Sequence, residues 1–368
     1  MIETYAMYAF IAILLLLLFW KWKRFEVKGL FPFIYFALYK TTWGIRLMDR
    51  IAKFRLRWFF SLGVIVCFLG MIVICYVLVE NTIALFSKPD SVAGILPVLP
   101  IEAKGVFYVP FFYWIISIFV IAVVHEFCHG IASRIEGVKV KSSGFAFLGI
   151  LAPIVPAAFV EPDEKALMKK DAWAKLRVFA AGPFANLVCV VIVLILAVML
   201  APVLDRVVDP AGMGVFSVVN DSPSSAVGIE KGDVFLEIDG RLVLDSDDFN
   251  NVTSSLIPGQ NILVKTNRTS HSLFLGNHSG KAYFGVSLMQ QYNSKSMFSD
   301  FVIWLMGLFK WLVMLNLGVG LFNLVPIGPL DGGRMLQVVF RKKVRAWHFI
   351  SLFFFIIVMA NLITGFLK

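Results

Sequence analysis

Charged residues are scarce in this chain. They make up 16% of its 368 residues, whereas 59% are hydrophobic and 36 are phenylalanine. A water-soluble fold cannot cover so much apolar surface, so the composition excludes an ordinary soluble protein and predicts a polytopic membrane protein. Cysteine is also rare: all four lie within apolar stretches, so the sequence indicates no disulfide framework.

Acidic residues are outnumbered by basic ones, and the formal net charge is +10. In a soluble protein this excess would favour a nucleic-acid partner, but here Lys and Arg occur in blocks between apolar runs. Residues 21–57 contain ten of them, residues 131–177 contain eight, and a further block lies at 341–345. Because cytosolic loops of membrane proteins are enriched in Lys and Arg, these blocks indicate the cytosolic side. We therefore expect a lipid bilayer as partner and no nucleic acid.

Apolar runs long enough to cross a bilayer occur about six times. The expected transmembrane helices cover residues 4–22, 58–79, 106–129, 174–201, 298–322 and 347–367. With the basic blocks inside, both ends of the chain lie outside. An amphipathic stretch at 46–57 is expected to form a helix on the membrane surface. Residues 143–156 are too short to span and are interrupted by Gly and Pro, which predicts a re-entrant hairpin.

Residues 205–290 are more polar and alternate between strand-like runs and turns, which predicts an α/β domain outside the membrane. Three Asn-x-Ser/Thr sequons in it, at Asn251, Asn267 and Asn277, suit an extracytosolic side, although chance sequons would look the same. The expected fold is thus a polytopic α-helical membrane protein with one inserted extracytosolic α/β domain. Its expected divisions are 1–105, 106–204, 205–290, 291–335 and 336–368.

The strongest local pattern is His125-Glu126-x-x-His129, at the end of an apolar run. On a helix, positions four residues apart lie roughly 40° apart around the axis, so both imidazoles can bind one ion. The pattern is typical of zinc sites with a Glu as general base. A lone buried His is more often a hydrogen-bonded core residue, but three ionisable groups in a membrane segment indicate function. Cys128 is left out, because free Cys is commonly a small buried apolar residue.

A catalytic zinc site usually has three protein ligands and an open position, so one more donor is needed. Asp331 is the best candidate, because it follows a helix broken by Pro and Gly at the same expected membrane depth. The alternative for Asp331 is a helix-capping role. Glu161 and Asp163 lie in a polar loop and need no metal to explain them.

The fourth expected span contains Gly182-Pro183-Phe184-Ala185-Asn186. Proline is expected to interrupt the helix there, although Gly and Pro could equally serve close helix packing. Asn186 would place an amide inside the membrane, where it needs hydrogen-bond partners. We expect it to contact the motif helix and regard it as a candidate substrate-binding residue.

Together these motifs resemble the site-2 protease family of intramembrane zinc metalloproteases, whose core would cover about residues 106–335. The matching stretches are His125-Glu126-x-x-His129, Gly182-Pro183-x-x-Asn186 and Asn323-x-x-Pro326-x-x-Pro329-Leu330-Asp331-Gly332. The resemblance implies Zn²⁺ as the cofactor, with His125, His129 and Asp331 as ligands. It further implies that Glu126 is the general base and that Asn323 holds the substrate backbone.

Residues 222–240 look like the core signature of a PDZ domain, which many members of this family insert between these motifs. The resemblance implies that the inserted domain screens substrates by size or binds C-terminal peptides. Gly212-Met213-Gly214-Val215 is a weak candidate for its carboxylate-binding loop, and ordinary turn glycines explain this stretch as well. A purely structural domain is the alternative.

The resulting hypothesis is hydrolysis of a peptide bond within or near a transmembrane helix of a membrane-protein substrate. The hairpin near 143–158 would offer an edge strand to the unwound substrate. A prokaryotic plasma membrane is the expected location, with the metal site toward its cytosolic half. The alternatives are a prenyl-processing membrane protease with a Glu ligand, a transporter, and a catalytically silent scaffold. The lack of a fitting later Glu and of an inverted repeat disfavours the first two.

Overall fold

The structure is a computed structural model that describes residues 2–20, 26–31, 34–54, 56–87, 93–149, 155–278 and 280–367. Internal contacts divide the chain into two compact units. The core unit consists of Met1–Leu196 and Gly307–Lys368, and the inserted unit is Ala197–Met306. The inserted unit contains the whole polar stretch 205–290.

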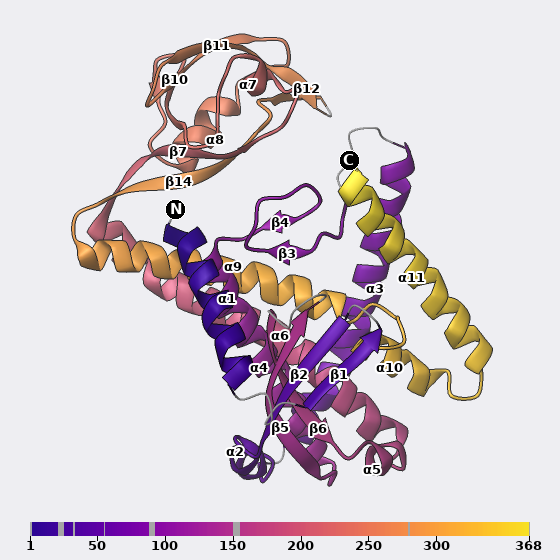
Figure 1. The fold of residues 1–368 in the computed structure, drawn as a ribbon. Coiled ribbons are helices and arrows are strands. Elements are labelled where there is room, and N and C mark those ends of the chain that lie inside the picture. The colour runs from indigo at the N-terminus through magenta and orange to yellow at the C-terminus, as the bar shows by residue number, and fades with distance from the viewer. Residues whose placement is uncertain are drawn as a thin grey trace. The chain divides into compact units, whose positions relative to one another are not determined.

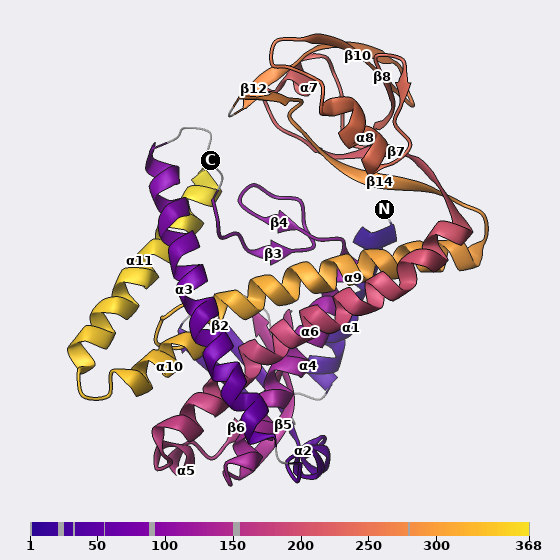
Figure 2. The ribbon, with the colours of Figure 1, turned by 180° about the vertical axis from the view of Figure 1, so that it is seen from behind.

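The core unit is built mainly from helices (Figures 1 and 2). The helices that lie in it wholly or in part are α1 (Ile2–Trp20), α2 (Ile45–Ile51), α3 (Arg57–Ser87), α4 (Phe111–Ile135), α5 (Glu164–Met168), α6 (Ala172–Val207), α9 (Met297–Phe322), α10 (Asp331–Val339) and α11 (Val344–Leu367). Five of them, α3, α4, α6, α9 and α11, are long and apolar enough to cross a membrane, and each overlaps an expected span, with ends that differ by up to eight residues. The apolar part of α1, Glu3–Leu17, is shorter, so the sixth span stays a prediction.

Helix α6 runs without interruption through Gly182 and Pro183, so the expected break in the fourth span is wrong. Its neighbours Ala181 and Phe184 are buried in the main core of the unit. This packing outweighs the one backbone hydrogen bond that Pro183 cannot donate. The pair therefore lies inside a continuous helix.

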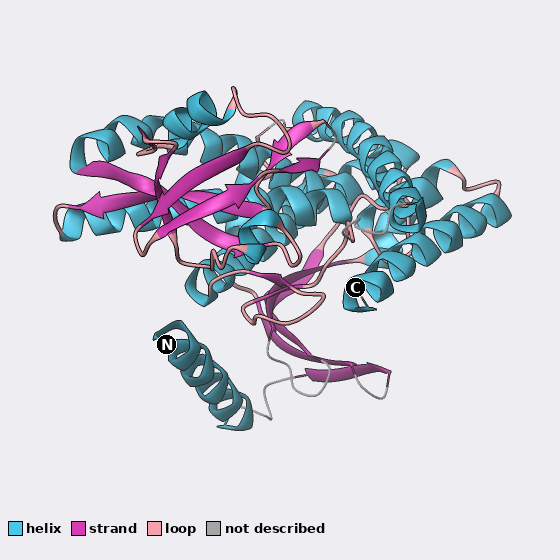
Figure 3. Cartoon of the chain, turned by 90° about the horizontal axis from the view of Figure 1, so that it is seen from above, coloured by secondary structure: helices cyan, strands magenta, loops and turns pink. Residues whose placement is uncertain are grey.

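A four-stranded antiparallel sheet joins two segments that are distant in sequence (Figure 1). Figure 3 draws the strands of the chain in magenta and its helices in cyan. Its strands are β1 (Glu26–Phe31), β2 (Ile34–Thr41), β5 (Val140–Gly149) and β6 (Val155–Pro162), in the order β1-β2-β5-β6. Strands β5 and β6 form the expected hairpin, with the tip at 150–154 outside the described residues. The hairpin β1–β2 was not predicted, and the surface helix expected at 46–57 is shorter, because α2 ends at Ile51. A further short parallel pair is formed by β3 (Val98–Leu99) and β4 (Phe107–Tyr108).

One hydrophobic core joins α3, α4, α6 and α10. It contains Cys67 from α3, Ile131 from α4, Phe179 from α6 and Met335 from α10, all buried. The outward faces of the long helices are apolar instead: large side chains such as Ile72 and Phe349 are more than half exposed. Such a surface suits lipid rather than water. The core fixes the end of α4 against the start of α10.

The inserted unit is a small sheet domain with its own core. Its elements are β7 (Val208–Val218), α7 (Pro223–Ala226), β8 (Val234–Ile238), β9 (Arg241–Leu242), α8 (Ser246–Thr253), β10 (Asn261–Thr266), β11 (Ser270–Phe274), β12 (Gly276–His278), β13 (Lys281–Tyr283) and β14 (Val286–Ser294). The main sheet has the order β11-β10-β8-β7-β14, with β9 beside β8. Phe235, Ile238, Val264 and Leu273 are fully buried in its core.

The stretch Gly212–Val215, the candidate carboxylate loop, lies inside strand β7. Met213 and Gly214 pair with Phe235 and Val234 of β8 on one side, and with β14 on the other. Its backbone groups are therefore used within the sheet. The prediction of a carboxylate-binding loop at these residues is wrong, because two neighbouring strands already occupy both edges of the stretch.

A buried carboxylate, Asp233, ties the turn before β8 to the loop after β10. Its oxygens accept hydrogen bonds from Arg268 and from the backbone N–H of Glu230. Burial by itself raises the pKa of this carboxyl, but the two hydrogen bonds outweigh it, so the pKa lies below its ordinary value. Such a group adds stability above the unfolded pKa of about 3.9, and that stability is lost as the pH falls through the folded value.

We expect the amides of β8 and β10 to exchange faster, relative to intrinsic rates, at pH 3 than at pH 6. Asp233→Asn should lower the stability of the inserted unit by about 1–2 kcal/mol at pH 6 and weaken this pH dependence. Hydrogen exchange read by mass spectrometry on the full chain measures both. Asp247→Asn, at an exposed position of α8, is the matched control and should behave like wild type. A pH dependence that is unchanged in Asp233→Asn would contradict this role.

Candidate metal centre

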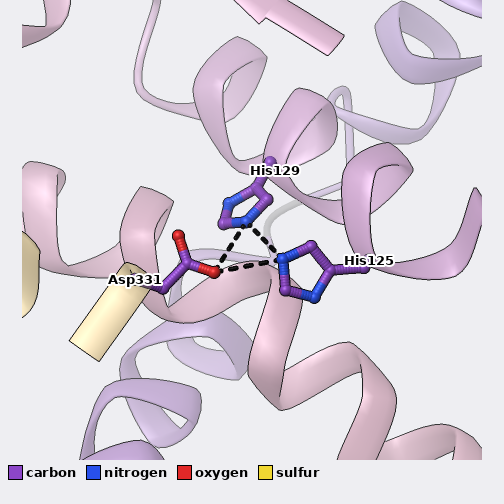
Figure 4. Close-up of side chains that lie close together, drawn as sticks. All are labelled: His125, His129 and Asp331. Carbon is purple, nitrogen blue, oxygen red and sulfur yellow. Dashed lines mark hydrogen bonds and ion pairs between the residues drawn. The ribbon is translucent and has the colours of Figure 1, made fainter. Parts of the chain in front are cut away.

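Three side chains, two from the C-terminal half of α4 and one from α10, lie close together (Figure 4). His125 Nε2 and His129 Nε2 lie 3.1 Å apart on one face of α4. Asp331 Oδ2, from the first residue of α10, lies 3.0 Å from His125 Nε2 and 3.3 Å from His129 Nε2. Within the described part of the chain, these three residues form one cluster of possible metal ligands. Two imidazole nitrogens and a carboxylate oxygen are a donor set that fits zinc.

Hydrogen bonds to the outer ring nitrogens orient the two imidazoles. His129 Nδ1 lies 2.7 Å from the carbonyl oxygen of Val178, which can only accept, so Nδ1 carries the proton and Nε2 keeps its lone pair. At His125, the neighbour of Nδ1 is the amide of fully buried Asn186, whose Nδ2 lies 3.2 Å away. Asn186 Oδ1 has no hydrogen-bond partner among the described residues.

When the Asn186 amide is turned by 180°, its oxygen faces His125 Nδ1. Oδ1 then accepts a hydrogen bond from His125 Nδ1–H, and His125 Nε2 has its lone pair directed at the cluster. The expected contact between Asn186 and the motif helix is thus present, and it is a contact to a candidate ligand. Full burial beside His125 favours an orienting role, while substrate binding by Asn186 stays a prediction.

Gly182 of α6 lies directly against the two imidazoles. A Cβ atom at this position would be 2.5 Å from His125 Nε2 and closer still to His129 Nε2. Both nitrogens are the ones that face Asp331, so only a residue without a side chain leaves the space between the donors open. This explains the glycine of the Gly-Pro-x-x-Asn pattern through the metal site rather than through helix packing alone.

The loop before α10 places Asp331. Gly332 donates its backbone N–H to the Asn323 carbonyl at 2.8 Å, so the start of α10 folds back onto the end of α9. A Cβ at Gly332 would overlap the carbonyl of Leu324, and one at Gly333 would overlap that of Ile327. The two glycines therefore permit backbone contact within this loop.

Glu126 and the predicted substrate residue Asn323 line one cavity of about 280 Å³ together with the donor cluster. Glu126 Oε2 accepts a hydrogen bond from the backbone N–H of Val160 in β6 at 3.1 Å. This contact holds the carboxylate in the cavity that the two imidazoles line. The structure thus brings five of the six predicted site residues to one cavity, and the sixth, Asn186, lies behind His125.

The competing carboxylates are used elsewhere. Glu161 accepts a hydrogen bond from Ser142 and pairs with Lys40. Asp163 caps α5, and the hydrogen bond from the backbone N–H of Ala166 holds the pKa of that carboxyl below its ordinary value. Sequence reasoning missed Arg334 and Glu164, which also line the cavity. The sequence does indicate Arg334 as a site residue, because it lies three residues after Asp331 and therefore on the same face of a helix.

The sequence matches the profile of Peptidase family M50 over residues 113–363. The chain belongs to peptidase family M50. An uncharacterized protein of Methanocaldococcus jannaschii is 26% identical to this M50 chain over 81% of its length and 75% of the relative's. A candidate zinc metalloprotease of Clostridium perfringens is 25% identical over 61% of the chain and 82% of its own length. The membrane-bound transcription factor site-2 protease homolog of Arabidopsis thaliana is 28% identical over 67% of the chain but only 47% of its own length.

Membership of family M50 confirms the family resemblance that the motifs indicate, and the matched region contains every predicted site residue. Among solved structures, the PDZ domain of an SdrC-like protein from Listeria monocytogenes aligns with 21% of this chain and 87% of its own. The identity is 25% and the TM-score is 0.20, so this likeness carries no argument about the fold.

Proposed function

We propose that this M50 peptidase is an intramembrane zinc metalloprotease of the site-2 type. Its reaction is hydrolysis of a peptide bond within or near a transmembrane helix of a membrane-protein substrate. One observation carries the proposal: two His nitrogens and an Asp oxygen converge beside Glu126 in one cavity, and α4, which bears the two His, is long and apolar enough to cross a membrane. Zinc is the metal named for the Clostridium perfringens relative.

His125, His129 and Asp331 would hold the zinc ion. The donor types fit, the ring nitrogens are oriented by Val178 and Asn186, and Gly182 leaves the space between the donors open. When bound, zinc acts as a Lewis acid that makes water a stronger nucleophile and polarises a carbonyl group. The other steps belong to side chains of this chain.

Glu126 is the general acid and base of the proposal. It takes a proton from the attacking water as the bond from water oxygen to carbonyl carbon forms. It then gives that proton to the amine as the C–N bond breaks, so the carboxylate is restored. The hydrogen bond from Val160 N–H holds one oxygen of this carboxylate in place in the cavity that the two imidazoles also line.

Strand β6 and Asn323 would present the substrate. Of the described strands, β6 is the last in its sheet, and its edge faces α4 at Val160. An unwound substrate segment could pair along this edge and replace the hydrogen bonds that its helix gives up, each worth several kcal/mol in lipid. Asn323 lines the same cavity and can bind the segment's backbone through its amide.

The basic blocks at 21–57 and 131–177 support a metal centre toward the cytosolic half of the membrane and an inserted unit outside. The short form, with about six spans and one inserted domain, supports a plasma membrane as the location. On this arrangement, residues 106–204 and 291–335 are the two halves of the protease core. The polar domain at 205–290 is a PDZ-like module that screens substrates or binds their C-terminal peptides.

The proposal predicts that cleavage depends on a bound metal. Purified full chain in detergent should cleave a reporter protein that carries a transmembrane helix, and a zinc chelator should lower the rate at least about 100-fold. Adding zinc back in excess should restore it. A scaffold without activity would give no cleavage under any condition, and cleavage that is indifferent to the chelator would exclude the zinc mechanism.

A further inference from the structure

The cavity of the metal centre contains one Lys or Arg side chain among its described lining residues, Arg334. The acidic groups around it are Glu126, Asp331 and Glu164. Arg334 lies three residues after Asp331 on α10, so the two side chains leave the same helix face one turn apart. Neither metal binding by the three donors nor proton transfer by Glu126 requires a permanent positive charge in this cavity. The presence of Arg334 therefore indicates a further role.

Arg334 is held in a defined orientation at the rim of the cavity. Its guanidinium lies over the ring of Phe179, 4.3 Å from the ring centroid, and Phe179 is itself buried. One guanidinium nitrogen donates a hydrogen bond to Glu164 Oε1. The side chains become more exposed from floor to rim: 13% for Asp331, 33% for Arg334 and 68% for Glu164.

The pair between Arg334 and Glu164 is weak as a structural tie. Exposed ion pairs contribute about 0–1 kcal/mol, and Glu164 stands at the start of a helix of five residues. Arg334, in contrast, is fixed by the stacking on Phe179 whether or not Glu164 is present. The Glu164 carboxylate therefore marks a position at which a carboxylate binds Arg334. Another carboxylate can replace it there with a small loss of free energy.

We propose that Arg334 is a substrate-binding residue that recognises a carboxylate next to the scissile bond. The inference rests on the proposed function and deepens it. Planar guanidinium groups bind carboxylates through paired N–H donors, which no other described residue that lines this cavity offers. The spacing of about 5–6 Å between side chains three apart on a helix equals about two residues of an extended peptide.

Two groups have this chemistry. The first is an Asp or Glu side chain within about two residues of the scissile bond. The second is the new C-terminal carboxylate of the product that ends at the cleaved bond. Strand β6 ends at Pro162, two residues before Glu164, and Val160 and Glu164 line the same cavity. A substrate segment paired along β6 at Val160, which contacts Glu126, would therefore run from the general base toward Arg334.

The first arm of the test uses reporter substrates that differ only in Asp or Asn at each of the three positions on either side of the scissile bond. In wild type we expect Asp at one position to raise kcat/KM about tenfold over Asn, as one charge-assisted hydrogen bond would. Arg334→Gln should reduce this ratio to about one, Arg334→Lys should keep part of it, and Glu164→Gln should raise it. The control Arg341→Gln removes an exposed Arg outside this cavity and should leave the ratio unchanged.

The second arm measures binding without turnover. A product peptide with a free C-terminal carboxylate and the same peptide as an amide are titrated calorimetrically into Glu126→Gln full chain with a chelator present, so that no metal can hold the carboxylate. We expect about tenfold tighter binding of the acid, lost in the double variant with Arg334→Gln. A preference for the acid in the first arm alone identifies a substrate side chain as the carboxylate that Arg334 binds. A preference in the second arm alone identifies the new C-terminus of the product.

The proposal is overturned if neither arm shows a preference for the acid, or if the preference survives Arg334→Gln. Failure of the proposed function gives a different result. Wild type would then cleave none of the reporters, while the binding measurement would still report whether Arg334 recognises a carboxylate. Cleavage of all reporters at equal rates, with equal binding of acid and amide, removes the role of Arg334 and leaves the protease intact.

Discussion

Replacing Glu126 with Gln is expected to lower kcat by about 10²- to 10⁴-fold while the bound metal is retained. A glutamine has the same shape, and its amide oxygen can still accept the hydrogen bond that Val160 N–H donates to Glu126 Oε2. Strand β6 should therefore keep its place beside α4. The amide cannot take a proton from water at neutral pH, so only the proton transfer is lost.

The matched control for this change is Glu161→Gln, because Glu161 is one residue after Val160 and is engaged by Ser142 and Lys40 outside the cavity. Initial rates with the reporter substrate and zinc content by mass spectrometry should separate the two variants. Full activity in Glu126→Gln would show that another group transfers the proton. A loss of zinc in that variant would show instead that Glu126 holds the metal site together.

The donor cluster could be predicted because each half of it is local in sequence. His125 and His129 share one helix face by periodicity alone, and Asp331 follows a stretch where Pro and Gly must end a helix. The apolar runs likewise gave five helices, because a bilayer demands about 20 apolar residues in a row. These features depend on few long-range contacts.

The pairing of β2 with β5 could not be predicted, because it joins segments more than 100 residues apart. Strand β2 pairs with β5 along seven residues, from Tyr35 opposite Gly149 to Thr41 opposite Ser143, and no local pattern near residue 35 indicates this partner. The expected break at Pro183 failed for the same reason: propensity favours a break, and the surrounding core overrides it.

Gly182→Ala is expected to abolish zinc binding, although it removes no ligand and adds a single methyl group. The new Cβ would lie 2.5 Å from His125 Nε2 and closer still to His129 Nε2, where real carbon atoms do not approach. Both imidazoles would have to turn away from Asp331, and His129 would lose the hydrogen bond to the Val178 carbonyl. Since shifts in supporting contacts alone cost 10- to 100-fold in metal affinity, we expect a loss of at least about 100-fold here.

The helix itself should tolerate the change, because Ala is favoured over Gly in a helix by about 1 kcal/mol. Gly318→Ala is the matched control: Gly318 also lies in a membrane-length helix, α9, and a Cβ there meets no atom within 4 Å. Zinc titration monitored with a competing chromophoric chelator, together with circular dichroism, should show an intact helical fold in both variants and zinc binding only in Gly318→Ala. Wild-type zinc affinity in Gly182→Ala would mean that the metal does not occupy the space between His125 and His129. The assignment of His125, His129 and Asp331 as zinc ligands would then be wrong. The Glu126→Gln variant would still test the general base.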